Sequence, residues 1–120
     1  MSAPLWAQRL VERVIIAEDL DDPPTLIWRR SKRNKQSSGR TYIVKRPGRI
    51  VITAGTLRRD QRLVLLHELA HHVTLELHTP TFWAKAWELY RRYQVPIRYA
   101  LQREGTYRKG AAIAYQRSRV

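Results

Sequence analysis

The chain has 120 residues, enough for one domain with a single core and too few for two. It contains no cysteine, which excludes disulfide bonds and thiolate metal sites, and no apolar run approaches the length of a membrane helix. With 23 Lys and Arg against 10 Asp and Glu, the net charge is +13 and favours a polyanionic partner, most simply nucleic acid. Charged residues interrupt the N-terminal apolar segment where a signal peptide needs an unbroken run, so a cytoplasmic protein is expected.

The first half of the chain is expected to form one helix and three strands. Residues 4–20 have an apolar side with helical spacing, whereas residues 25–30 are rich in β-branched and aromatic residues and predict a strand. A polar loop is expected over residues 31–40. Residues 41–45 and 49–53 then predict a β-hairpin, because Pro47 and Gly48 occupy turn positions between them.

The second half of the chain predicts three helices and a basic tail. The first helix has Asp60 as its favoured N-cap, with Arg59 and Thr56 as alternatives. Its buried stripe is predicted at Leu66, Ala70, Val73 and Leu77. Thr79 and Pro80 read as the N-cap and first residue of a helix over residues 79–93, and residues 97–104 predict a last one. The tail, about residues 105–120, has three alternatives: a docked short helix, a polyanion-binding segment or a frayed end.

All four histidines lie within residues 67–78, and the first two frame a motif. His67-Glu68-Leu69-Ala70-His71 has the H-E-x-x-H pattern of zinc metallohydrolases. Residues i and i+4 share a face of a helix, so His67 and His71 can point two imidazoles at one Zn²⁺ ion. Glu68 lies beside that face, where it can take a proton from a water whose pKa the metal lowers.

A catalytic zinc typically keeps three protein ligands, so a third is required. His78 is the favoured candidate, because the chain turns back between His71 and the helix that starts at Thr79. Glu88 on that next helix is the alternative ligand, and it can also be a solvated residue or a carboxylate behind a ligand. His72 points away from the His67/His71 face and is expected to pack or hydrogen-bond locally.

The stretch over residues 65–72, followed by residues 78–82, resembles the SprT-like (Spartan-like) zincin peptidases. Their pattern is H-E-x-x-H, a short spacer, then H-G-P-x-F at the start of the next helix. The resemblance implies that His67, His71 and His78 are zinc ligands, that Glu68 is the general base and that Phe82 anchors the next helix. It further implies substrates that are proteins bound to DNA or crosslinked with it.

Two departures from that pattern concern this chain. Thr79 stands where the family has Gly, and the absence of cysteine removes the zinc ribbon that many relatives carry. The metzincins do not fit, because Thr74 and Leu77 occupy the positions where their motif requires Gly and His, and the only methionine is Met1.

The order of elements matches a single α+β domain over residues 1–120 with a minimal zincin core. That core has an N-terminal helix, a small three-stranded, mostly antiparallel sheet, the motif helix and a following helix. In such folds the strand before the motif helix lies near the cleft, and an extended peptide can add to its edge. Here that strand is predicted over residues 49–53.

Basic residues gather in the segment between Asp22 and Asp60, which contains no acidic residue. Its first part supplies the expected nucleic-acid contacts: Arg29, Arg30, Lys32, Arg33, Lys35 and Arg40. The alternative is a solvated basic hairpin without a partner.

The sequence therefore predicts a zinc-dependent endopeptidase that acts on a protein or peptide substrate, with DNA as a further partner and no membrane. The oxyanion donor is left open among four residues: Tyr90, Tyr93, Arg98 and Tyr99. Two alternatives remain. One is a basic nucleic-acid-binding protein with a structural or degenerate zinc site, and the other is a peptidase that cleaves a regulator of a phage or mobile element.

Overall fold

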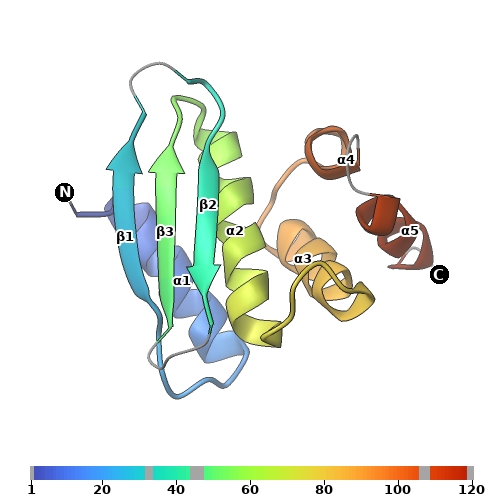
Figure 1. Cartoon of the computed structure of the whole chain (residues 1–120), viewed down its shortest axis with the longest axis horizontal. Helices are drawn as coiled ribbons and strands as arrows, with labels where there is room; N and C mark the ends of the chain where they lie inside the picture. Colours follow the sequence, from blue (N-terminus) through green and yellow to red (C-terminus); the bar gives the residue numbers. More distant parts are fainter. Residues whose placement is uncertain (1, 32–33, 44–47, 106–108, 119–120) are drawn as a thin grey trace.

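The computed structural model describes residues 2–31, 34–43, 48–105 and 109–118. Within them the chain is an α+β protein, which confirms the expected fold class. Eight elements follow in chain order: α1 (Leu5–Ala17), β1 (Thr25–Arg30), β2 (Ser38–Tyr42), β3 (Arg49–Ala54), α2 (Arg58–Thr74), α3 (Pro80–Arg92), α4 (Ile97–Gly105) and α5 (Lys109–Ser118). Figure 1 shows α1 behind the sheet, α2 beside it, and α3 to α5 beyond α2.

The three strands form one mixed sheet in the order β1-β3-β2. β1 pairs with β3 in parallel, with Thr25 opposite Arg49, whereas β2 pairs with β3 antiparallel, with Ser38 opposite Thr53. The sheet is therefore mixed where a mostly antiparallel one was expected, because the chain reverses twice between β1 and β3. β3 is the central strand with both sides paired. The prediction that it offers an edge to a peptide is wrong, and β2 is the edge strand beside α2 (Figure 1).

The core lies where α1, β3, α2 and α3 meet. Ile50 and Ile52 of β3 are fully buried, as are Leu65 and Leu69 of α2. Burying an aliphatic side chain of this size stabilises a fold by about 1.5–3 kcal/mol. α3 completes the core with its predicted apolar side, Phe82, Trp83, Ala86, Trp87 and Tyr90. The motif helix is thus held on several sides by apolar contacts.

Asp60 is not the N-cap of α2, as was predicted, but its third residue; Leu57 stands at the cap position. The Asp60 carboxylate is fully buried and accepts hydrogen bonds from the Ser37 backbone N–H, the Tyr99 hydroxyl and Arg103 Nε. These donors come from the segment before β2 and from α4. Asp60 therefore joins three separate parts of the chain, which local sequence does not reveal.

A tight turn joins α2 to α3. Leu75 ends α2 with left-handed backbone angles, φ 56° and ψ 27°. The predicted stripe of α2 accordingly stops at Val73, and Leu77 lies beyond the helix with 72% of its surface exposed. Thr79 is the N-cap of α3, its hydroxyl accepting a hydrogen bond from the Phe82 N–H, and Pro80 follows as the first residue, as predicted.

Two other segments differ from or refine the expectations. β2 begins at Ser38, inside the predicted loop, where Ser38 pairs with Thr53 of β3. The residues 109–118 of the basic tail form a docked helix, since Trp87 Nε1 donates to the Ala111 carbonyl at 2.8 Å and the Tyr115 ring packs on Trp87. No helix in the described part of the chain is long and apolar enough to cross a membrane.

Candidate metal centre

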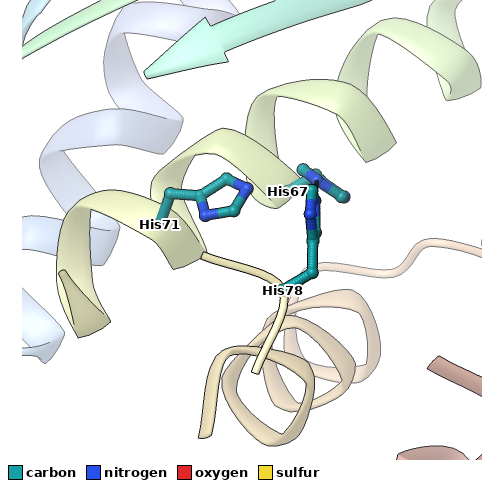
Figure 2. A group of neighbouring side chains, drawn as sticks. All are labelled: His67, His71 and His78. Carbon is teal, nitrogen blue, oxygen red and sulfur yellow. Dashed lines mark hydrogen bonds between the residues drawn. The ribbon is translucent and has the colours of Figure 1, made fainter. Parts of the chain in front are cut away.

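Three of the four histidines converge at the junction of α2 and α3. His67 and His71 lie one turn apart on α2, and His78 lies in the turn just before α3. One ring nitrogen from each can be chosen so that all three lie within 4.8 Å of one another. Figure 2 shows the ring of His71 directed toward His67 and His78. The described residues thus bring together a group that could hold a metal ion.

Two of the three imidazoles are oriented by acceptors on their Nδ1 atoms. His71 Nδ1 lies 2.7 Å from the Glu76 carbonyl oxygen, and His67 Nδ1 lies 2.6 Å from Glu104 Oε2. Both partners are acceptors, so the Nδ1–H groups donate and the Nε2 atoms are left to face a ligand. Burial lowers the pKa of His71 to about 4, so this imidazole is neutral at pH 7, as a metal ligand must be.

Glu104, on α4, is the residue of this centre that the sequence analysis missed. It is buried, and its Oε2 atom also accepts a hydrogen bond from the Tyr90 hydroxyl at 3.1 Å. Burial alone raises the pKa of Glu104, but the hydrogen bond with His67 leads the contributions that bring the pKa below its ordinary value. An ionised carboxylate therefore lies behind His67. In the sequence, Glu104 differs from its surroundings only as the one acidic residue of a helix whose other charged residues are basic.

Two aromatic rings at the start of α3 support the histidines. The Phe82 ring stacks on His71 at 4.0 Å between centroids and lies within 5.2 Å of His78. Trp83 stacks on His78 at 5.5 Å. Both aromatic side chains are almost fully buried. They fix the direction of α3 relative to α2, which is the anchoring expected of Phe82.

Glu68 lines the same cleft as the three histidines, which has a volume of about 380 Å³. Thr41 of β2 donates a hydrogen bond to Glu68 Oε1 at 2.7 Å. The backbone of Gly39 packs closely against the Glu68 side chain, so that a Cβ atom on residue 39 would lie 2.7 Å from Glu68 Cγ. Burial is the largest influence on the Glu68 carboxyl and raises its pKa. β2 thus positions the motif glutamate through two residues that the sequence analysis did not select.

Other candidate site residues lie outside this centre. Glu88 is exposed on α3 and forms an ion pair with Lys85, 3.1 Å away. His72 is buried beside Gly48, as its local-packing interpretation implies, and does not belong to the histidine group. None of the four oxyanion candidates lines the cleft: Tyr90, Tyr93, Arg98 and Tyr99. The cationic side chains that do line it are Arg40 and Arg103.

The expected nucleic-acid residues are dispersed. Arg29, Arg30, Lys35 and Arg40 are all exposed, and of these only Arg40 lines the cleft beside the histidines. Lys32 and Arg33 lie outside the described residues. Successive strand residues point to opposite faces, so Arg29 and Arg30 do not converge on one ligand.

Comparison with known proteins gives no match: no family model, no curated protein and no solved structure is similar to this chain.

Proposed function

We propose that this chain is a zinc-dependent peptidase in which His67, His71 and His78 hold the metal and Glu68 is the general base. The observation that carries the proposal is the convergence of three imidazoles in one cleft with the motif glutamate. Neither feature alone defines a hydrolase. Their combination supplies both a metal site and a proton acceptor next to it.

The donor set fits zinc. Two nitrogens on one tetrahedral zinc, each about 2.0–2.1 Å from the ion, lie about 3.3 Å apart. The Nε2 atoms of His67 and His78 are 3.2 Å apart, and the donor nitrogens of all three histidines lie within 4.8 Å of one another. The histidine group has three members among the described residues, and three protein ligands are typical of catalytic zinc because they leave a position for water or substrate.

The chemistry then divides between the metal and this chain's own residues. A zinc ion bound there would polarise the peptide carbonyl and lower the pKa of the attacking water. Glu68 accepts the proton of that water and passes it to the leaving amine nitrogen. The raised pKa of Glu68 suits this role, since it brings the proton affinity of the carboxylate closer to neutral pH. The Thr41 hydroxyl fixes one carboxylate oxygen, leaving the other for the water.

An extended peptide is the substrate that this cleft suits. Ser38, Gly39 and Arg40 line the cleft, and they belong to β2, an edge strand of the sheet. An edge strand has unpaired backbone groups along one side, to which a peptide can hydrogen-bond as an added strand. The scissile bond would then lie between β2 and the histidines. By the SprT-like resemblance, a DNA-associated protein is the proposed substrate.

The main alternative is a nucleic-acid-binding protein with a structural zinc. Structural zinc sites are closed by a fourth protein ligand, and a carboxylate such as that of Glu88 is the type of group that could close this one. Its ion pair with Lys85 on an exposed face speaks against this role. A peptidase directed at a regulator shares all of the chemistry above and differs only in its substrate.

Metal content and proteolysis, measured together, test the proposal. Mass spectrometry of the untagged protein should find one zinc per chain, lost in His78→Ala and kept in Glu88→Ala. A peptide library made by digesting a proteome reports cleavage. Glu68→Gln should keep zinc and cut about 10²–10⁴-fold more slowly, whereas Glu88→Gln is the matched control and should cut at the wild-type rate. Zinc-loaded wild type that cleaves no peptide, or Glu68→Gln at full rate, contradicts the proposal.

A further inference from the structure

A second cleft lies between α1, α2 and the end of α3, and it shares no lining residue with the histidine cleft. Its volume is about 400 Å³. Four arginines from three helices line it: Arg9, Arg13, Arg62 and Arg92. We call it the arginine cleft. In Figure 1 its α1 wall lies behind the sheet.

The convergence of these arginines follows from helix geometry. Arg9 and Arg13 are four residues apart on α1 and therefore share one face. Arg62 faces them from α2, and Arg92 is the last residue of α3. Residues far apart in sequence thus line one hollow with four arginine side chains.

Within the described part of the chain, the arginine cleft lacks a compensating carboxylate. The described residues that line it include no Asp or Glu, and none of the ion pairs found in the described part of the chain involves the four arginines. A fifth arginine, Arg58, stacks on the Trp6 ring at the cleft wall, 4.1 Å from its centroid. Like charges held together this way repel one another, and an anion in the cleft removes the repulsion.

We propose that the arginine cleft binds the backbone phosphates of a nucleic acid. Guanidinium groups form paired hydrogen bonds with phosphate oxygens, and several around one hollow can contact successive phosphates. Trp6 and Tyr93 also line the cleft, and arginine side chains lie over both rings, Arg58 at 4.1 Å and Arg92 at 5.8 Å from the ring centroids. This site is separate from the predicted contacts at Arg29 and Arg30, and it does not depend on peptidase activity.

Fluorescence anisotropy with a short labelled DNA duplex and its single strand tests the site. The test variant is Arg9→Ala/Arg13→Ala, whose two side chains are exposed, so the fold should persist. The control is Arg49→Ala/Arg98→Ala, which removes the same charge from exposed positions that neither line the arginine cleft nor belong to the predicted nucleic-acid contacts. Affinities are measured between about 50 and 200 mM KCl, because each lost phosphate contact flattens the log–log salt slope by about 0.9 for duplex DNA.

The test variant should lose at least about tenfold in affinity and flatten the salt slope by about two, while the control changes affinity less than about threefold. Equal losses in both variants would mean that net charge alone attracts DNA, which overturns the proposal. So would unchanged DNA affinity in the test variant. Binding to phosphatidylserine vesicles is measured in parallel, because lipid headgroups are the other source of phosphate. If the test variant loses vesicle binding but keeps its DNA affinity, the proposal is overturned. Thermal melts of both variants confirm folding.

Discussion

His67 Nδ1 lies 2.6 Å from Glu104 Oε2, although the two residues are 37 positions apart in the chain. This contact makes α4 part of the candidate metal centre. A carboxylate behind a ligating histidine fixes the ring orientation and raises its basicity. The centre therefore depends on a helix that the H-E-x-x-H motif does not include.

Glu104→Gln should weaken zinc binding by about 10- to 100-fold, because the amide carries no charge to support His67. Competition with a chromophoric chelator measures this change. Glu104→Ala should in addition lower the free energy of unfolding by about 1–3 kcal/mol, since it removes the buried carboxylate that accepts hydrogen bonds from His67 and Tyr90. Glu88→Gln is the control and should bind zinc as the wild type does. If Glu104→Gln binds zinc with wild-type affinity, α4 does not contribute to the metal centre.

Gly39→Ala should lower proteolysis at least about tenfold while zinc content stays at one per chain. The new Cβ would lie 2.7 Å from Glu68 Cγ and 3.0 Å from Oε2, so the flexible glutamate must move from its position on Thr41. Gly105→Ala is the matched control, because a Cβ there meets nothing within 4 Å. Peptide-cleavage rates and metal analysis of the two variants decide the point. Equal rates in both would show that β2 does not position Glu68.

Tyr99→Phe should destabilise the fold by about 1 kcal/mol at pH 8, because Asp60 loses a hydrogen bond. Burial, followed by the hydrogen bond to Asp60, raises the pKa of Tyr99 to about 12 from 10.0. A folded-state pKa above the unfolded value means that the stabilisation is complete below pH 10 and disappears as pH rises through about 12.

Urea unfolding at a series of pH values from 8 to 12 measures this effect as the difference between wild type and variant. The other groups that titrate in alkali are common to both proteins and cancel. The difference should shrink steadily above pH 10. A constant difference would mean that the Tyr99 hydroxyl is not coupled to Asp60.

Leu75→Gly should raise the free energy of unfolding by about 0.5–1 kcal/mol and leave zinc binding unchanged. Leu75 has φ 56°, a left-handed conformation that costs a side-chain-bearing residue about 1–2 kcal/mol and glycine almost nothing. Ile16→Gly is the comparison, because Ile16 is also exposed but lies inside the helix α1. There glycine only increases the freedom of the unfolded chain and should destabilise. The urea denaturation midpoints of the two variants should shift in opposite directions, upward for Leu75→Gly and downward for the comparison variant.

Local spacing determined much of this protein. The four-residue interval of His67 and His71 places them on one helix face whatever surrounds the helix. Thr79 followed by Pro80 specified the start of α3, and the β-branched run specified β1. Periodicity likewise identified the buried side of α3 and, in α2, the buried positions Leu66 and Ala70, although Leu77 lies outside the helix. These features depend on neighbours within a turn or a strand, so the sequence reveals them.

Only the tertiary structure decided which distant side chains meet. It placed Glu104 behind His67, directed Gly39 and Thr41 onto Glu68, and made Asp60 a buried junction instead of a helix cap. It also paired β1 with β3 in parallel, which made β3 the central strand and left β1 and β2 at the edges. The arginine cleft draws its residues from three helices. Such contacts depend on how whole elements pack, and the energy of that packing is spread over the entire core, beyond the reach of any local pattern.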